Sequence, residues 1–482
     1  MKSPRRGPGQ RPAGGRDDRL ARPPRGNRPA IDPAREAAYE AVNAVHRDDA
    51  YANLVLPRLL RETGVTGRDA AFATEVTYGT LRQTGTLDAI VEAAAGRPMD
   101  KIDPPVRDAL RIGAYQLLHM RVGAHAAVST TVDLVRSLSP GAAGFANAVL
   151  RRVAEADRTA WIERLAQDSG ADPIARAALA HAHPQWIVRA FVDALGSLDE
   201  AELALDADNL PPPVHLCARP GLVTAASLAG SMRGATVGRY SPYTVVLSGG
   251  GDPHTIPAIR DGHAHVQDEG SQLVAAALAA APVAGRDERW LDLCAGPGGK
   301  AGLLGALARE RDAHVTAVEI AQHRAELVAK ATSGLPVYTI KADGRDVGKD
   351  TDLPEGDFDR VLVDAPCTGL GALRRRPEAR WRRQPSDLPP LTRLQRELLQ
   401  SAFRAVRPGG VVAYVTCSPH QAETEVSVTE AARRSPVEMD LLDVRPYLPA
   451  SLPELGTGPT VQLWPHRHGT DAMFIAMLRR TA

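Results

Sequence analysis

Two cysteines lie directly after strand-like segments in the second half of the chain. Cys367 belongs to DAPCTGLG (364–371), which follows the apolar run VLV, and Cys417 belongs to TCS (416–418), which follows GGVVAYV. A cysteine thiolate is a nucleophile, and covalent catalysis divides one difficult step into easier ones. Taken alone, either cysteine has a plain alternative as a small buried hydrophobe. Because both occupy the same place after a strand, we interpret them as reactive thiols above one crevice.

A glycine-rich turn lies upstream, in LDLCAGPGGK (291–300), between a short apolar strand and a helix. Gly296, Gly298 and Gly299 allow the backbone to turn sharply and to approach a ligand, and the start of the helix supplies free N–H groups. NAD is a rival ligand for such a turn, but the spaced GxGxxG pattern is absent. ATP is disfavoured because no Lys/Ser pair follows the glycines. Cys294 is expected to contribute its backbone to this turn and to have no reactive role.

Acidic residues end the following strand-like segments. Glu319 ends HVTAVE and is placed to accept hydrogen bonds from ribose hydroxyls, with a surface charge as the alternative. Asp343, in IKADGRD, is placed to bond the exocyclic amine of adenine, although the following Gly344 leaves an Asx turn open. Asp364 ends the strand before Cys367. Carboxylates at strand ends beside a glycine turn suit an adenosyl ligand that bears no phosphate.

The segments that must position these residues alternate between strand and helix patterns from residue 263 onward. The strand-like segments are RWLDLCAG, AHVTAVEI, PVYTIKAD, FDRVLVDAP and GGVVAYVTCS, and the helical ones include KAGLLGALARE, AQHRAELVAKA and LTRLQRELLQSAFRAV. Repeated βα units predict a doubly wound, Rossmann-like α/β sheet with a ligand crevice at the carboxyl ends of its strands. We therefore assign residues 263–482 to one catalytic domain.

The front of the chain has a different pattern. Residues 32–165 predict one helix after another, because apolar residues recur three to four positions apart in 34–45, 68–81, 105–118 and 127–138. The stretches RDAAFATEVTYGTLR, LRIGAYQLLHM and AVSTTVDLVRSLSPGAAGFANAVLRRV are similar to the NusB domain, an RNA-binding helical bundle. Phe145, Asn147, Arg151 and Arg152 lie near its end, where the arginines either face RNA or are solvated ends of a helix.

Two further segments complete a multidomain organisation. Residues 1–31 carry nine Lys or Arg against two Asp, among many Pro and Gly, and are expected to be a disordered basic tail. This tail is either passive or a loose electrostatic arm for phosphates. Residues 166–262 combine helical stretches, three prolines at 211–213 and the short strands VHLCA and YTVVLS, which predict a small α+β linker domain.

These motifs together resemble the RsmB/NSUN family of RNA 5-methylcytosine methyltransferases, and the NusB-like front end narrows the resemblance to the RsmB (Sun/Fmu) type. The resemblance is carried by VQDEGSQLVA, LDLCAGPGGK, DAPCTGLGALRRRPEARWRR, VTCSPHQAETE and LWPHRHGTDAMFIAML. The chain departs from the family pattern at Gly296, where Ala is common, a change that we expect to be sterically minor. It also departs at LCARP (216–220), which replaces a more usual Arg-Xaa-Asn pattern.

The resemblance implies an S-adenosyl-L-methionine-dependent RNA (cytosine-5)-methyltransferase that acts on 16S ribosomal RNA. It implies Cys417 as the nucleophile that adds to C6, Cys367 as the thiol that assists release, and Asp364 as the partner of the cytosine's polar edge. Lys300 would contact either the base or the cofactor. The cofactor-binding residues are then Cys294, Ala295, Gly296, Pro297, Gly298, Gly299, Lys300, Glu319, Asp343 and Asp364.

The segment between the two thiol motifs, LRRRPEARWRR (373–383), is strongly basic. Six arginines stand against Glu378, and Trp381 interrupts them. Arginines with an interleaved aromatic suit phosphate contact and base stacking, so we predict an RNA-binding loop, with a solvated basic loop as the alternative. The net charge of the whole chain is only +1, so RNA binding requires local patches of this kind.

The remaining composition limits the class of protein. The four cysteines form no CxxC pair, so no metal site is expected, and Cys217 and Cys294 are expected to be structural. The chain has no signal-peptide pattern and no apolar run of about 20 residues, which predicts a cytoplasmic protein without a membrane span. We expect a monomer.

Three alternatives remain open at this point. A DNA cytosine methyltransferase would use the Pro-Cys thiol, Cys367, for attack and would leave Cys417 unexplained. A non-catalytic RNA-binding factor would be built on the NusB-like bundle, but the glycine turn and both thiols argue against loss of the activity. A transfer-RNA substrate would change the target and leave the chemistry as it is.

Overall fold

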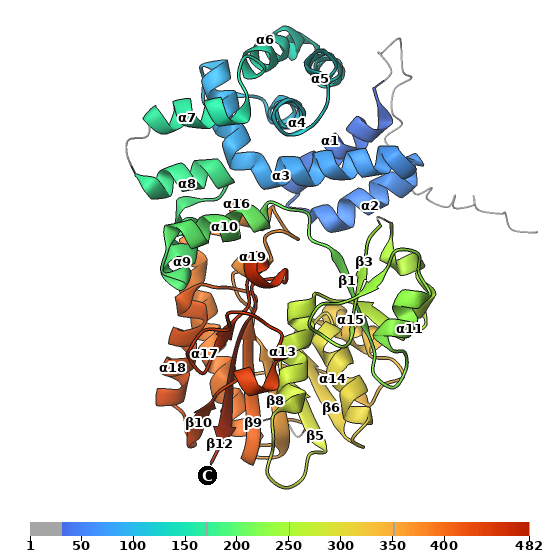
Figure 1. The fold of residues 1–482 in the computed structure, drawn as a ribbon, viewed down its shortest axis with the longest axis vertical. Coiled ribbons are helices and arrows are strands. Elements are labelled where there is room, and N and C mark those ends of the chain that lie inside the picture. The colour runs from blue at the N-terminus through green and yellow to red at the C-terminus, as the bar shows by residue number, and fades with distance from the viewer. Residues whose placement is uncertain (1–30, 169–171, 250, 350–351, 482) are drawn as a thin grey trace, which may run out of the picture.

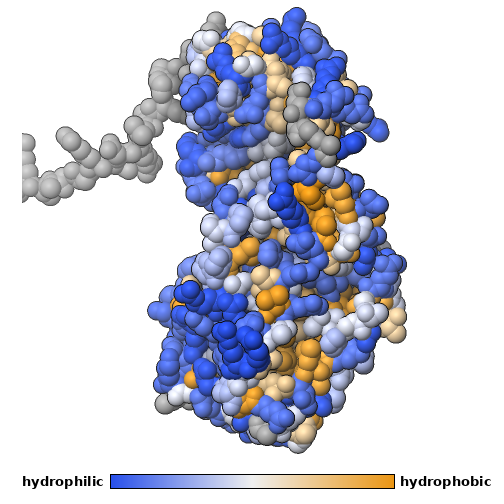
Figure 2. Space-filling view, turned by 90° about the vertical axis from the view of Figure 1, so that its left-hand side faces the viewer, coloured by the Kyte–Doolittle hydropathy of each residue, from blue (hydrophilic) through white to orange (hydrophobic). Residues whose placement is uncertain are grey.

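The computed structural model describes residues 31–168, 172–249, 251–349 and 352–481. The basic tail expected at 1–31 therefore lies outside the described residues except for its last position. Figure 1 shows a helical region at one end of the molecule and a large sheet with flanking helices at the other, with short helices between them. In the space-filling view, hydrophilic residues dominate the visible face, and smaller hydrophobic patches are visible both at the top and on the lower part (Figure 2).

The helical region begins with a well-capped helix. The carboxylate of Asp32 accepts hydrogen bonds from the backbone N–H groups of Ala34 and Arg35, and Pro33 occupies the first helical position. Six helices form this region: α1 Pro33–Arg47, α2 Ala52–Thr63, α3 Gly67–Ala95, α4 Pro104–His119, α5 Ala124–Leu138 and α6 Ala143–Val153. Their apolar faces meet in one core that includes Val42, Ile90, Leu110 and Leu150. The prediction of an all-helical front end is confirmed, although α3 continues well beyond the expected segment 68–81 and ends at Ala95, with Gly96 as its C-cap.

Four helices connect this region to the sheet: α7 Arg158–Asp168, α8 Pro173–His181, α9 Gln185–Leu195 and α10 Leu198–Asp208. Their apolar side chains do not form a free-standing core. Ile187 and Phe191 of α9 pack in one cluster with Leu370 and Leu373, which follow the Pro-Cys motif, and with Trp464 near the carboxyl end of the chain. The connecting helices therefore rest directly on the segment that carries Cys367.

A small antiparallel sheet follows, with strand order β2-β3-β1-β4. Its strands are β1 Val214–Ala218, β2 Thr236–Val237, β3 Thr244–Leu247 and β4 Ala264–Val266, and the helices α11 Ala225–Gly230 and α12 Pro257–Arg260 lie between them in sequence. The sheet extends past the boundary expected at residue 262, because Leu216 to Ala218 of β1 pair with Ala264 to Val266 of β4. The chain thus enters the catalytic part directly from a strand of the smaller sheet.

The large sheet has the order β10-β12-β9-β8-β5-β6-β7, with β11 paired to β12. The strands are β5 Arg289–Asp292, β6 His314–Glu319, β7 Val337–Lys341, β8 Phe358–Asp364, β9 Val406–Thr416, β10 Met439–Leu442, β11 Val461–Gln462 and β12 Phe474–Arg480. The helices are α13 Glu269–Ala280, α14 Gly299–Arg309, α15 Gln322–Ala331, α16 Ala379–Arg382, α17 Leu388–Ala405, α18 Glu425–Arg433 and α19 Pro465–His468. Strands β5 to β9 are parallel, which confirms the predicted Rossmann-like α/β fold.

The register of the parallel strands brings the motifs to one edge. Asp292 of β5 stands opposite Leu362 of β8, and Asp364 of β8 stands opposite Val415 of β9. The glycine turn, the Pro-Cys loop and the Thr-Cys loop therefore begin side by side at the carboxyl ends of three neighbouring strands. Among the helices of the described ranges, none is both long and apolar enough to cross a membrane.

Candidate active site

The two thiols predicted from the sequence lie next to each other. The Sγ atoms of Cys367 and Cys417 are 3.4 Å apart, and both residues are half-buried. Backbone hydrogen bonds hold the loops together, since Ala365 N donates to Val415 O and Gly371 N donates to Cys417 O, each at 2.9 Å. The structure thus brings together two residues that are 50 positions apart in the sequence.

The two thiols are electrostatically unequal. The hydrogen bond from Cys367 lowers the pKa of the Cys417 thiol, and the Lys300 ammonium acts in the same direction. The same hydrogen bond, together with burial, raises the pKa of the Cys367 thiol. These opposite shifts favour the thiolate, the nucleophilic form of cysteine, on Cys417 rather than on Cys367.

Lys300 links the glycine turn to the Pro-Cys motif. Its Nζ atom lies 2.8 Å from Oδ2 of Asp364, and its side chain is largely buried. The charge of Asp364 raises the pKa of Lys300 against the opposing effect of burial. The ion pair stands beside Cys417, so one cation serves both the carboxylate at the end of β8 and the reactive thiol.

The glycine turn leaves space that side chains would fill. Gly298 has φ +108°, and a Cβ there would lie 2.8 Å from the Cβ of Ala331. A Cβ on Gly296 would lie 2.1 Å from Oε2 of Glu319. Ala in place of Gly296 would therefore require the ends of the Glu319 and Arg324 side chains to shift. That the change is sterically minor stays a prediction.

One oxygen of a buried carboxylate beside this turn has no hydrogen-bond partner among the described residues. Asp292 is fully buried, its Oδ1 accepts a hydrogen bond from Cys294 N at 3.2 Å, and its Oδ2 receives none from the described part of the chain. Burial, aided by the charge of Asp364, raises the pKa of Asp292 to about 7. An unpaired buried acceptor is costly, and the amino group of S-adenosyl-L-methionine is a donor of the kind that would satisfy it. The residues present therefore fit this cofactor.

The other acidic residues named in the sequence occupy the expected strand ends. Glu319 is nearly buried at the end of β6, where Oε1 accepts a hydrogen bond from Ala321 N at 3.0 Å and Oε2 lies 3.4 Å from Arg324 Nε. Asp343 follows β7 and forms the Asx turn that the sequence left open, since its Oδ1 accepts from Arg345 N at 3.0 Å. The Arg345 guanidinium also binds this carboxylate and lowers its pKa.

The remaining residues of the turn contribute backbone. Ala295 N donates to Val318 O of β6 at 2.9 Å, and the peptide bond between Gly296 and the exposed Pro297 is cis. Burial raises the pKa of the Cys294 thiol well above its ordinary value, which disfavours a thiolate there. Burial likewise raises the pKa of Cys217, in the small sheet, to about 12. Neither thiol has the lowered pKa that Cys417 has.

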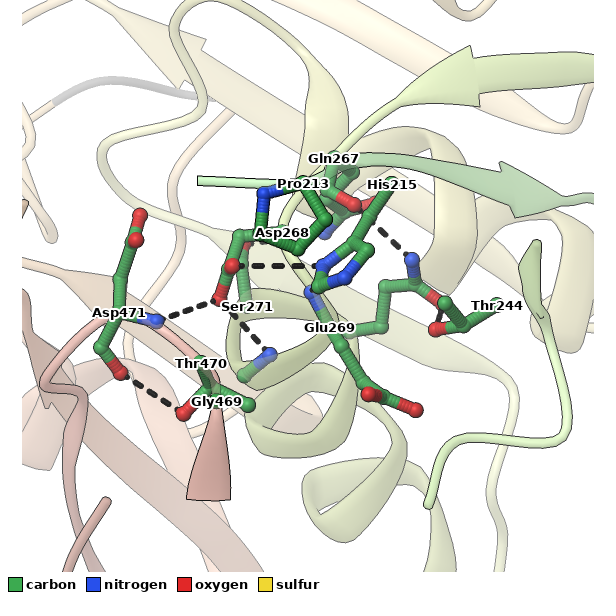
Figure 3. Close-up of polar contacts among 12 residues, drawn as sticks. Pro213, His215, Thr244, Gln267, Asp268, Glu269, Ser271, Gly469, Thr470 and Asp471 are labelled. Carbon is green, nitrogen blue, oxygen red and sulfur yellow. Dashed lines mark hydrogen bonds and ion pairs between the residues drawn. The ribbon is translucent and has the colours of Figure 1, made fainter. Parts of the chain in front are cut away.

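A polar network joins the small sheet to the loop that follows α19 (Figure 3). Asp268 Oδ2 accepts hydrogen bonds from Gly270 N at 2.8 Å and from Asp471 N at 3.1 Å, and Asp268 Oδ1 lies 3.5 Å from His215 Nδ1. Although burial raises the pKa of Asp268, His215, Arg375 and Arg374 together hold it well below its usual range. Ala472, the next residue after Asp471, donates its N–H to Gly371 O. The network therefore reaches the loop that is bonded to Cys417.

The basic segment 373–383 is not the free RNA-binding loop predicted from the sequence. Arg374 and Arg375 pair with the carboxylates of Asp268 and Asp471. Arg380 is fully buried and Arg382 is half-buried. Of the six arginines in this segment, Arg376 alone is exposed. These guanidiniums are buried because they satisfy carboxylates and carbonyl oxygens where the helical and catalytic parts meet.

The contacts of this segment show what it joins. Arg380 Nη1 donates to Arg82 O at 2.9 Å and to Asn209 Oδ1 at 2.7 Å, and Arg382 Nη2 donates to Val45 O at 2.7 Å. Trp381 packs on α3, where a Cβ added to Gly85 would lie 2.1 Å from its ring. The segment therefore fastens the helical region to the loop behind Cys367, and its aromatic ring is used for packing.

The arginines at the end of the helical region remain at the surface. Arg151 and Arg152 are exposed; Arg151 Nε bonds Asn147 Oδ1 at 3.3 Å, and Arg152 Nη1 bonds Ala94 O at 3.0 Å. The guanidinium carbon of Arg97 lies over the ring of Phe145, 4.7 Å from the centre of that ring. Both alternatives stated for these arginines, RNA contact and solvated helix ends, are compatible with such positions.

Sequence reasoning missed one buried acid near the thiols. Glu423 is fully buried, six positions after Cys417, and its carboxylate binds the residue that follows Cys367. Nothing in VTCSPHQAETE distinguishes Glu423 from Glu425, which is exposed. The only available signal was the quoted motif itself, and it assigns no role to either acid.

Comparisons with known proteins follow the same division of the chain. Residues 278–479 match the family model described as 16S rRNA methyltransferase RsmB/F, and residues 32–155 match the NusB family. A putative methyltransferase of Mycobacterium tuberculosis is 59% identical over 452 residues, which cover 93% of this chain and 97% of that protein. The ribosomal RNA small subunit methyltransferase B of Salmonella choleraesuis is 31% identical over 453 residues, covering 92% and 98%.

Solved structures share the fold. The crystal structure of PH0851 superposes with a TM-score of 0.77, covers 94% of this chain and 100% of its own, and is 23% identical. The structure of NSun6 from Pyrococcus horikoshii with SFG has a TM-score of 0.51, covers 62% and 98%, and is 19% identical. At these identities the likeness concerns the fold alone.

Proposed function

Because this chain belongs to the RsmB/F family of S-adenosyl-L-methionine-dependent rRNA methyltransferases, we propose that it methylates carbon 5 of a cytosine in 16S ribosomal RNA through a covalent adduct with Cys417. The observation that carries the proposal is the pair of thiols, 3.4 Å apart, beside the ion pair of Lys300 and Asp364. Membership in the family confirms the resemblance found in the sequence. It also confirms S-adenosyl-L-methionine as the cofactor.

The first step uses the asymmetry of the two thiols. C5 of cytosine is a poor nucleophile, and addition of a thiolate at C6 turns the ring into an enamine-like species whose C5 is electron-rich. Cys417, with its lowered pKa, is the thiolate that adds. Asp364 would hold the polar edge of the base, and the target base must leave its stack to reach the crevice. The bound cofactor supplies the electrophilic methyl group.

The last step must restore the aromatic ring. The C5 proton leaves, its electron pair forms the C5–C6 double bond, and Cys417 departs as a thiolate. The hydrogen bond with Cys417 is the main cause of the raised pKa of Cys367. Once Cys417 is a thioether this cause disappears, so Cys367 can release its own proton to solvent and then accept the C5 proton. We assign Cys367 to this release.

Ribosomal RNA is the proposed substrate because the Salmonella choleraesuis relative, matched over 98% of its length, carries that substrate in its name. The NusB family match supplies a second RNA-binding part. This substrate places the reaction in the cytoplasm. Transfer RNA is the second candidate, with the same chemistry. A non-catalytic role is disfavoured, since the glycine turn, the unpaired Asp292 acceptor and both thiols are present together.

The decisive experiment separates the two thiols. Cys417→Ala and Cys367→Ala variants are incubated with S-adenosyl-L-methionine and 16S ribosomal RNA, with methyl transfer and denaturant-stable protein–RNA adducts as readouts. We expect Cys417→Ala to lose both, and Cys367→Ala to accumulate the adduct. Cys217→Ala, at a buried position in the small sheet, is the matched cysteine control. Retained turnover in Cys417→Ala would falsify the assignment and favour Cys367 as the nucleophile.

The modified position can be identified separately. Bisulfite sequencing of ribosomal RNA from a deletion strain should show the loss of protection at one cytosine. Loss of protection in a transfer RNA, with ribosomal RNA unchanged, would select the second candidate.

A further inference from the structure

We infer that Glu423 is a positioning residue for the release step, because its carboxylate fixes the loop of Cys367 against the loop of Cys417. The inference rests on the proposed function, in which Cys367 assists release. The carboxylate of Glu423 binds Thr368, the residue after Cys367, and it binds Gln395, which in turn bonds Pro366, the residue before Cys367. Through these contacts it holds the thiol in place.

The carboxylate binds the residue after Cys367 with both oxygens. Thr368 N donates to Glu423 Oε1 at 2.8 Å, and the Thr368 hydroxyl donates to Oε2. Both residues are almost completely buried, so water does not compete for these bonds. A carboxylate is well suited to this task because each of its oxygens accepts hydrogen bonds, whereas an amide would present donors at one of the two positions.

A second side chain ties the residue before Cys367 to the same acid. Gln395, fully buried in α17, donates from Nε2 to Pro366 O at 2.9 Å and to Glu423 Oε1 at 3.1 Å. Pro366 and Thr368 flank Cys367, and both are therefore held through Glu423. With its two neighbours fixed, the Cys367 backbone has little freedom to carry the thiol away from Cys417.

The acid is itself anchored to the strand of the nucleophile. The Tyr414 hydroxyl, buried in β9, donates to Glu423 O at 2.7 Å. The Thr368 hydroxyl donates its single hydrogen to Glu423. In the bond between Thr368 Oγ1 and Ser418 Oγ, at 3.2 Å, the Ser418 hydroxyl is therefore the donor. Ser418 follows Cys417. The chain of contacts thus runs from one thiol loop to the other with every donor in place.

The negative charge of Glu423 raises the pKa of the Cys367 thiol. No cation pairs with Glu423 among the salt bridges of the described residues, so its negative charge remains felt at Cys367. The hydrogen bond with Cys417 and burial raise the pKa of Cys367, and Glu423 adds to that shift. The acid therefore favours the protonated form of Cys367 in the resting enzyme, which leaves the thiolate on Cys417.

The experiment compares adduct formation with adduct release in single turnovers on 16S ribosomal RNA. For Glu423→Gln we expect adduct formation within about twofold of the unmodified enzyme and release slowed at least about tenfold, so that the adduct accumulates. Glu425→Gln is the matched control, because Glu425 is exposed two positions away. Thr368→Val, which removes only the hydroxyl, should slow release severalfold, and Thr368→Ser should restore it.

The outcomes distinguish the inference from the proposed function. If Cys367→Ala accumulates the adduct and Glu423→Gln releases it normally, the inference is wrong and the proposed function stands. If Cys367→Ala shows no accumulation, the proposed role of Cys367 is wrong and the inference falls with it. If Glu423→Gln instead lowers adduct formation, cofactor affinity and thermal stability together, Glu423 is merely structural. Where Glu423→Gln does not fold, the Thr368 pair decides, and equal release by Thr368→Val and Thr368→Ser overturns the inference.

Discussion

The Nζ atom of Lys300 lies 2.8 Å from Oδ2 of Asp364, and this ion pair joins the glycine turn to the Pro-Cys motif. Lys300 stands in the first turn of α14, and Asp364 is the last residue of β8. The same ammonium lowers the pKa of Cys417. The turn that fits the cofactor and the thiol proposed as the nucleophile are therefore coupled through one largely buried cation.

Lys300→Met should move the acid limb of the methylation pH profile to higher pH. The Lys300 ammonium stabilises the Cys417 thiolate. Without it, the pKa of the Cys417 thiol rises and the thiolate fraction at neutral pH falls. Activity near pH 7 should drop about tenfold if the thiol pKa rises by about one, and it should recover at alkaline pH. Alkylation of Cys417 by iodoacetamide, followed by peptide mass spectrometry across pH, measures the change. Lys330→Met, at an exposed position, is the control. The prediction is contradicted if Lys300→Met leaves the pH profile unaltered, or if Lys330→Met shifts it equally.

Asp292→Asn should remove a pH dependence from the stability of the cofactor-free enzyme. The pKa of Asp292 is raised to about 7 in the folded state by burial, against about 4 in an unfolded chain. Between these values the folded state holds a proton that the unfolded state releases, so stability falls as pH rises from 4 toward 7 and stays lower above it. The variant should therefore gain at least about 1 kcal/mol over the parent at pH 8, and less at pH 5.

Urea unfolding at both pH values measures this difference, and Asp440→Asn, on the exposed edge strand β10, is the control. Calorimetry should show that Asp292→Asn binds S-adenosyl-L-methionine more weakly, because the charged acceptor is lost. Equal cofactor affinity in the variant and the parent would argue that Asp292 does not face the cofactor.

Gly298→Ala should weaken cofactor binding at least about tenfold. The residue has φ +108°, which side chains rarely adopt, and the new Cβ would lie 2.8 Å from the Cβ of Ala331 and 3.2 Å from the Cα of Val328. The turn must shift, and with it the start of α14. Calorimetric titration with S-adenosyl-L-methionine provides the test. Gly144→Ala, with open space around the added Cβ, should leave binding unchanged.

Arg380→Met should destabilise the chain by about 3–5 kcal/mol, because it leaves buried acceptors without their donor. Arg380 serves Arg82 O, Asp208 O and Asn209 Oδ1, and it lies beside the fully buried Asp208. Chemical denaturation measures the loss. Arg376→Met, at the exposed position of the same segment, should change stability by no more than about 0.5 kcal/mol. Similar losses in both variants would mean that burial of Arg380 is not the cause.

The local features of the site could be predicted from the sequence. Cys417 directly follows β9 and Cys367 lies three residues after the end of β8. The glycine turn lies between a strand and a helix, and strand ends carry Glu319 and Asp364. Such features follow from patterns a few residues long, and parallel strands bring their carboxyl ends to one edge whatever the rest of the chain does. For that reason the Rossmann-like fold and the meeting of Cys367 with Cys417 could be anticipated.

The tertiary structure alone decided which charged side chains are buried. The arginines of 373–383 have the composition of an RNA-binding loop, yet Arg382 bonds Val45 O, 337 positions away, and Arg374 pairs with Asp471, 97 positions away. Likewise, Glu423 is buried and Glu425 is exposed, although only two positions separate them in the sequence. Whether a charge is solvated or buried depends on the donors and acceptors that distant segments place around it, because an unpaired charge in the interior is too costly. No local pattern contains that information.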